Sequence, residues 1–201
     1  VITIIVAGGK GKRIGANISK QFLHLNGKPI LAHTLKVFED CNSIDSIIVV
    51  SHPDDIDFCQ QNIIKKFGFK KIIKVVKGGK ERQDSVRNGL NAVDDKLYNI
   101  AVIHDGVRPF VSSQIIKKSI LSARKSGASV VCIPVKDTIK EASDGYVKKT
   151  LQRERLYLVQ TPQTFKMDII KEAHKRALEK GIKATDDSSL VEMLGIKVKI
   201  V

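Results

Sequence analysis

The stretch ITIIVAGGKGKRIGANISKQ, residues 2–21, decides how this chain is organised. Its apolar start, Ile2–Ala7, predicts a buried first strand. The strand runs into a turn rich in glycine and cations, residues 8–13, and Lys20 follows closely. Glycines let backbone N–H groups approach a ligand, and cations bind polyphosphates through charge-assisted hydrogen bonds. We therefore expect a nucleoside triphosphate site directly after the first strand, with a lysine-rich surface turn as the structural alternative.

Two familiar phosphate loops do not fit this turn. A Walker A loop needs Ser or Thr after its Gly-Lys pair, but Gly11-Lys12 is followed by Arg13, and Val6 stands where the first glycine belongs. A dinucleotide fingerprint needs the spacing G-x-G-x-x-G, and the last glycine here comes one residue too late. The turn therefore belongs to another kind of nucleotide site.

Length and composition predict a single globular domain covering residues 1–201, because such a chain can bury a full core. It contains neither a signal-peptide pattern nor a long apolar span, so we expect a cytoplasmic protein without a membrane partner. The three cysteines have no metal-type spacing and indicate buried or free thiols.

The net charge of +14 allows two interpretations. One is a nucleic-acid-binding surface, and the other is a small anionic substrate bound by a lysine-rich chain. The lysines are spread along the whole sequence, and only 5% of the residues are aromatic. A stacking platform for single strands needs more aromatic side chains, so we do not expect nucleic acid as a partner.

Apolar runs alternate with helical patterns along most of the chain. Strands are expected at residues 2–7, 46–50, 71–77, 100–104 and 128–134. Helices are expected at residues 30–40, 54–67 (with Asp54 near its cap), 82–93 and 113–126. This alternation predicts an α/β fold, a Rossmann-like, mostly parallel twisted sheet with helices on both faces.

The pattern changes after Pro134. Turn residues at 143–145, between short β-prone pieces, indicate a β-arm, about residues 136–160, that protrudes from the sheet and serves in dimerisation. A helix ending at Gly181, a shorter helix over residues 188–194 capped by residues 185–187, and a last strand over residues 196–201 complete the expected order.

Ligands of an open parallel sheet bind at the carboxyl ends of its strands, and Asp105 follows such a strand. Beside a triphosphate, an acid there is a candidate Mg²⁺ ligand or an acceptor for a substrate hydroxyl; pairing with Arg108 or capping a turn is the structural alternative. We interpret His104 as structural. Ser85 has the position of a simple cap. The motifs of covalent catalysis and of zinc binding are absent from the sequence.

Six further strings extend the opening stretch in order: SKQFL with GKPIL, GGKERQDSV, HDGVRPF, VKDTI, VQTPQTF and TDDSSLVE. Together they resemble the 2-C-methyl-D-erythritol 4-phosphate cytidylyltransferases of the non-mevalonate isoprenoid route. The resemblance covers nearly the whole chain and implies a reaction of CTP with methylerythritol phosphate, aided by Mg²⁺ or another divalent cation, in a homodimer joined through the arm.

The resemblance also implies site residues. Arg13, Lys20 and Arg153 are expected to be catalytic, the first two by stabilising charge on the phosphates. The nucleotide is expected to bind at Ala7, Gly8, Gly9, Gly11, Arg13, Lys20, Gly79 and Ser85. The methylerythritol phosphate pocket is expected to contain Asp105 (also the suggested metal ligand), Arg108, Thr138, Arg153 and Thr161, with Thr138 and Arg153 serving the partner subunit's site.

One departure and one rival accompany the resemblance. The family continues past this end into a segment with a phosphate-facing lysine, so we expect the native chain to extend beyond Val201. The rival is the ribitol 5-phosphate cytidylyltransferases, whose motifs overlap; the strings GGKERQDSV and TDDSSLVE favour methylerythritol phosphate.

Overall fold

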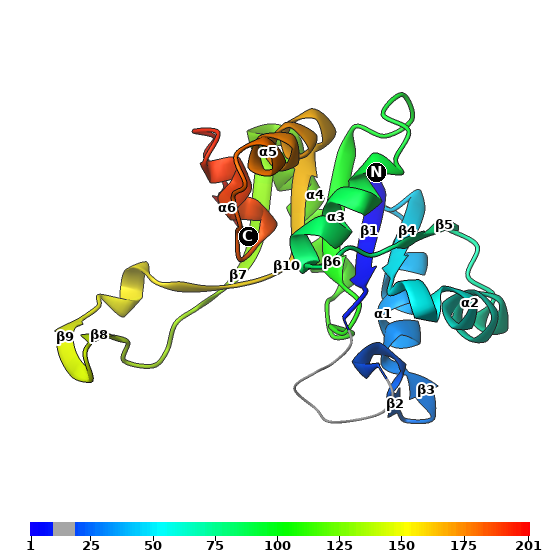
Figure 1. Ribbon diagram of the computed structural model, residues 1–201, viewed down its shortest axis with the longest axis horizontal. Helices are drawn as coiled ribbons and strands as arrows, with labels where there is room; N and C mark the ends of the chain where they lie inside the picture. Colours follow the sequence, from blue (N-terminus) through cyan, green and yellow to red (C-terminus); the bar gives the residue numbers. More distant parts are fainter. Residues whose placement is uncertain (10–18) are drawn as a thin grey trace.

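The fold is built on one seven-stranded sheet, seen in a computed structural model that describes residues 1–9 and 19–201 (Figure 1). The strands lie in the order β11-β7-β10-β6-β1-β4-β5. Their bounds are β1 Ile2–Ala7, β4 Ser46–Ser51, β5 Ile72–Lys77, β6 Ile100–Asp105, β7 Ala128–Pro134, β10 Tyr157–Lys166 and β11 Lys199–Ile200. The central strands β1, β4, β5 and β6 are parallel, which confirms the α/β prediction.

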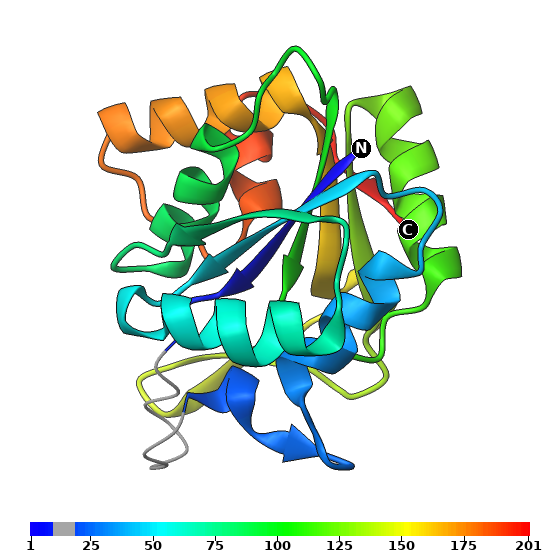
Figure 2. The ribbon, with the colours of Figure 1, turned by 90° about the vertical axis from the view of Figure 1, so that its right-hand side faces the viewer.

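Helices cover both faces of the sheet (Figure 2). One face packs on α1, α4 and the helical segment after β4, whose apolar side chains share a core with Ile5 and Val102. The other face packs on α3, α5 and α6 around Ile4 and Phe165. The bounds are α1 Ile30–Glu39, α2 Ile56–Phe58, α3 Arg82–Asn91, α4 Ser113–Ser126, α5 Met167–Glu179 and α6 Asp187–Glu192.

The helix expected over residues 54–67 is less regular than its pattern suggests. It begins with the 3₁₀ turn η2, Pro53–Asp55, passes through α2, and continues as the π-helical segment η3, Cys59–Lys65. His52 caps the start, because its Nδ1 accepts a hydrogen bond from the Asp54 N–H at 3.2 Å. Asp54 therefore lies in the first turn, near the cap as expected, and the capping residue itself is His52.

Strand β10 was not predicted. It is antiparallel to both neighbours and fills the space between β6 and β7. Three of its polar side chains, Thr161, Gln163 and Thr164, are buried, so the segment lacks the apolar run that marks the other central strands. The sheet is thus parallel in its β6-β1-β4-β5 half and mixed beyond it.

Two small hairpins project from this body. Strands β2 (His24–Leu25) and β3 (Lys28–Pro29) flank a turn at Asn26 and Gly27, whose φ angles are 48° and 75°. The expected arm leaves β7 and carries β8 (Lys140–Ser143) and β9 (Tyr146–Thr150) away from the sheet (Figure 1). Tyr157 of β10 already pairs with Pro134 of β7, so residues 135–156 lie outside the sheet.

Candidate active site

The predicted site lies at the carboxyl ends of the parallel strands, which together form one edge of the sheet. Ala7 of β1 is in register with Ser51 of β4, which is in register with Lys77 of β5. On the other side of β1, Asp105 ends β6 opposite Val6. The loops that leave these strands therefore come together at one edge of the sheet, as expected for a ligand site in an open α/β sheet.

One half of this edge consists of glycine backbone packed around the buried hydroxyl group of Ser85. Ser85 of α3 is 4% exposed, and its Oγ accepts a hydrogen bond from the Gly79 N–H at 3.0 Å and donates one to the Glu81 carbonyl at 3.1 Å. A Cβ on Gly8 would lie 3.6 Å from the same Oγ, and a Cβ on Gly78 would lie 3.1 Å from it. These three glycines let the backbone after β1 and β5 pack directly against Ser85, and we call this group the glycine wall.

The rest of the opening stretch is placed in part. Ala7 is buried, and Gly9 has open space beside it. Lys20 is exposed at the start of the 3₁₀ helix η1, Lys20–Phe22, and the preceding Ser19 is tied to Asp55 by a 2.9 Å hydrogen bond from its Oγ. The predicted residues Gly11 and Arg13 lie outside the described residues.

The other half of the edge is a cluster of charges around Asp105. Oδ1 of Asp105 accepts from Nε of Arg82 at 3.1 Å, and Oδ2 accepts from Nε of Arg108 at 2.9 Å. The Asp105 N–H donates to Oγ1 of Thr161 at 3.4 Å, and Arg108 also donates to the side-chain oxygen of Gln160. Asp105, Arg108 and Thr161, which the resemblance assigns to one pocket, therefore lie together.

His104 supports this cluster from the core. It is fully buried, its Nε2 lies 3.0 Å from the Arg108 carbonyl, and its ring packs on Phe38 with centroids 4.8 Å apart. Burial lowers the pKa of His104 from its ordinary value of 6.5 to about 4, so the imidazole is neutral. A neutral ring must carry its proton on Nε2 to donate to that carbonyl. This geometry agrees with the structural role predicted for His104.

The remaining predicted residues lie on the arm. Thr138 and Arg153 are exposed, and Nη1 of Arg153 donates to the Lys136 carbonyl at 3.1 Å. The arm carries both residues away from the body of the same chain (Figure 1). One chain therefore does not bring them to the Asp105 cluster.

Comparison with known proteins assigns this arrangement. The family described as 2-C-methyl-D-erythritol 4-phosphate cytidylyltransferase (IspD) matches residues 1–201. The chain belongs to the IspD family. A relative of that name from Clostridium novyi is 50% identical over 196 residues, which is 97% of this chain and 84% of the relative. One from Geotalea uraniireducens is 48% identical, over 100% of this chain and 87% of the relative.

Solved structures give the same result. The crystal structure of 4-diphosphocytidyl-2C-methyl-D-erythritol synthase from Anaerococcus prevotii superposes with a TM-score of 0.88 at 34% identity, covering 100% of this chain and 85% of that one. The cytidylyltransferase structure from Francisella tularensis superposes with a TM-score of 0.82 at 31% identity, over 100% of this chain and 88% of that one. Both the fold and the sequence are therefore those of IspD proteins.

Two partners in this IspD site were missed at the sequence level. Arg82 stands in the string GGKERQDSV and Gln160 in VQTPQTF, and the structure joins both to the Asp105 cluster. Charge complementarity with Asp105 was the available signal for Arg82, but 23 residues separate the two in sequence. Nothing in a linear sequence pairs an arginine with one acid among many.

The described residues of this IspD chain contain no group of three or more His, Cys, Asp or Glu side chains that could hold a metal ion. Each oxygen of Asp105 already accepts from a guanidinium group. Two adjacent positive charges oppose a cation there, so these residues alone do not fit a protein-held Mg²⁺ site.

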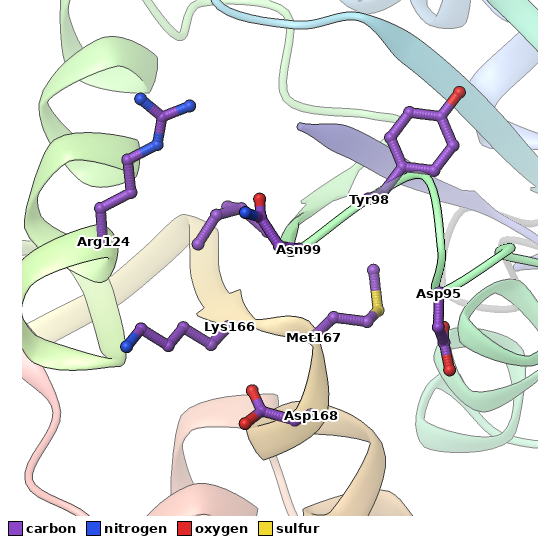
Figure 3. A pocket seen from close by; sticks show the side chains of 8 residues that line it. Asp95, Tyr98, Asn99, Arg124, Lys166, Met167 and Asp168 are labelled. Carbon is purple, nitrogen blue, oxygen red and sulfur yellow. The ribbon is translucent and has the colours of Figure 1, made fainter.

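One hollow in the described part of this IspD chain lies away from these residues. Its volume is about 560 Å³, and Figure 3 shows it between Lys166 and Arg124 on one side and Tyr98 and Asp95 on the other. Ile100 and Lys166 belong to it, and these residues begin β6 and end β10, at the sheet edge opposite Asp105. The glycine wall and the Asp105 cluster, and not this hollow, contain the predicted residues.

Among the described helices, none has the length and apolar character needed to cross a membrane.

Proposed function

We propose that this chain transfers a cytidylyl group from CTP to 2-C-methyl-D-erythritol 4-phosphate. A phosphate oxygen of the sugar phosphate attacks the α-phosphorus of CTP, the new P–O bond forms in line, and pyrophosphate leaves with the electron pair of the broken bond. The observation that carries this proposal is the family match over residues 1–201.

The geometry supports a division of the site into two halves. The backbone at Gly8, Gly78 and Gly79 packs around Ser85 after β1 and β5, and we propose that the base and ribose of CTP bind along it. Asp105 keeps free lone pairs beside its two arginine bonds, so it can accept hydrogen bonds from the hydroxyls of methylerythritol. Transfer between bound phosphates needs mainly positioning and charge stabilisation, which agrees with the lack of a nucleophile motif.

Positively charged side chains supply the charge stabilisation that the transfer needs. Lys20 is exposed at the edge that follows β1, and we propose that it and Arg13 stabilise the negative charge that grows on the phosphates. We also propose a need for Mg²⁺ or another divalent cation, whose main ligands would be phosphate oxygens of the nucleotide. Asp105 as a metal ligand stays a prediction.

The arm supports a homodimer as part of this proposal. Tyr146 and Val147 on β9 are 81% and 63% exposed, and large apolar side chains exposed on a projecting hairpin are available for contact with a second chain. Docking of the arm on a second copy would bring Thr138 and Arg153 to the partner's Asp105 cluster. Location in the cytoplasm and the absence of a nucleic-acid partner also stay predictions.

The test is turnover by the purified protein with CTP and Mg²⁺, comparing methylerythritol phosphate with ribitol 5-phosphate. Pyrophosphate release and the mass of the nucleotide product are followed. Preference for methylerythritol phosphate is expected, because the matched family carries that name. Preference for ribitol 5-phosphate would transfer the chain to the rival activity, and turnover without added divalent cation would refute the metal requirement.

A further inference from the structure

A line of charged and polar side chains connects the core beneath α5 and α6 to Asp105. It starts at His174 of α5, whose Nε2 lies 3.1 Å from Oδ1 of Asp187, the first residue of α6. Oδ2 of Asp187 accepts from Nη1 of Arg82 at 2.8 Å, and Nε of Arg82 donates to Asp105 at 3.1 Å. One arginine therefore bridges a buried carboxylate and a site carboxylate.

Asp187 is ionised despite its burial. Its side chain is 2% exposed, and burial alone would raise its pKa. The hydrogen bond from His174 and the charge of Arg82 outweigh that effect and hold the pKa of Asp187 below its ordinary value. Since a carboxylate can only accept, the His174 Nε2 carries the proton. Arg82, at the start of α3, is therefore bonded to a fixed negative charge in the protein interior.

Stability alone is a weak reason to keep this charge. Replacing a buried ion pair with apolar residues of similar volume is often neutral or stabilising. Orientation is a better reason, because a guanidinium group bonded through Nε on one side and Nη1 on the other cannot rotate freely. The Nε–H of Arg82 is thereby aimed at Oδ1 of Asp105.

We propose that Asp187 is a positioning residue that acts through Arg82 to orient Asp105 toward the hydroxyls of the sugar-alcohol phosphate. The proposal rests on the function given above. It explains why both halves of the Asp105 carboxylate are held: Arg108 bonds Oδ2 from the exposed side, and the Asp187–Arg82 pair bonds Oδ1 from the core. Without Asp187, Arg82 loses one of its two carboxylate acceptors and is no longer held in place. Only the more exposed Arg108 would then hold the Asp105 carboxylate firmly.

The test compares Asp187→Asn with Asp186→Asn in the full chain. Asp186 is the adjacent residue and loses the same charge, but its hydrogen bonds go to Gln163, Ser188 and Ser189 instead of Arg82. For Asp187→Asn we expect the KM for methylerythritol phosphate to rise about 10- to 100-fold, the cost of a misplaced binding group, while the KM for CTP changes less than about twofold. Asp186→Asn should leave both KM values near those of the wild type.

A merely structural role predicts a different outcome. Partial unfolding lowers kcat through the active fraction and leaves both KM values unchanged, and this result in Asp187→Asn would overturn the proposal. If Asp187→Asn does not fold, Arg82→Lys carries the test, since lysine keeps the charge but lacks the fixed fork through which Arg82 bonds Asp105 by Nε and Asp187 by Nη1.

A double variant tests whether Asp187 acts through Arg82. Adding Asp187→Asn to Arg82→Lys should raise the KM for methylerythritol phosphate little beyond Arg82→Lys alone, because the two residues work as one unit. Fully multiplicative effects would contradict action through Arg82. Wild-type turnover is measured first, and its absence would refute the proposed function and this inference together.

Discussion

Acid is expected to destabilise this protein through His104. The ring is completely buried against Phe38, with Nε2 on the Arg108 carbonyl, and its Nδ1 has no hydrogen-bond partner among the described residues. A proton on Nδ1 would place a charge in the core beside two arginines, Arg108 and Arg82. The nearby Asp105 favours that charge but does not compensate for burial, so the pKa of His104 falls to about 4.

The direction of the effect follows from this pKa. His104 has a pKa of about 4 in the folded protein and 6.5 as an ordinary value, so the unfolded chain binds the proton first as the pH falls. The contribution of His104 is fully present above pH 6.5 and is lost between pH 6.5 and pH 4. Between these two pKa values the free energy of unfolding falls by about 1.4 kcal/mol per pH unit. At pH 5, about 1.5 pH units below the unfolded pKa, the protein has therefore lost about 2 kcal/mol.

The assay is urea unfolding of the wild type and of His104→Gln at about pH 7.5 and about pH 5. Glutamine keeps an N–H donor near the position of Nε2 but does not titrate. Other groups lose stability equally in both proteins, so the wild type should lose about 2 kcal/mol more than the variant. Equal losses in the two proteins would refute the reasoning and show that the buried imidazole does not resist protonation.

Three further predictions concern the site. Lys20→Ala should lower kcat at least about 100-fold, the scale of one lost preorganised charge donor; a change confined to the KM for CTP in steady-state kinetics would make it a binding residue. Mixing inactive Arg153→Ala and Lys20→Ala subunits should restore some turnover, and no recovery in mixed dimers shown to form would place the site within one chain. Gly79→Ala puts a Cβ 2.2 Å from the Asp84 Cβ, so it should displace the start of α3 and lower the free energy of unfolding by about 1–3 kcal/mol; an unchanged urea midpoint would contradict this.

Most of the sheet could be predicted because its strands are apolar runs. Ile2–Ala7 and Ser46–Ser51 are buried on both faces, and continuous apolar sequence is what such strands require. Strand β10 has no such apolar run and was missed, because its buried side chains Gln163 and Thr164 are polar and form their hydrogen bonds inside the protein. Thr164 Oγ1 lies 2.9 Å from Ser119 Oγ, and Gln163 accepts from the N–H groups of Asp187 and Ser188. Pro162 in its middle also argues against a central strand by sequence alone.

The site could be predicted by residue, and so could the nearby pairing of Asp105 with Arg108, but the distant partners could not. The family strings indicated Asp105, Arg108 and Thr161, and these lie within hydrogen-bond reach of one another through Asp105. The bond from Arg82 to Asp187 spans 105 residues, and neither local pattern nor spacing encodes such a contact. Thr138 and Arg153 show a different limit, since their expected place is on another copy of the chain.

The direct pairing of Pro134 with Tyr157 has a consequence for engineering. The arm leaves and rejoins the sheet at two residues that face each other on neighbouring strands, so it is one very long hairpin loop. Loop-closure entropy depends only weakly on loop length, and a short turn could therefore replace residues 135–156 without altering the order of the strands. Such a shortened chain would keep the nucleotide half of the edge and lose Thr138 and Arg153. The arm is thus a detachable module whose length and sequence can change while the body of the enzyme stays the same.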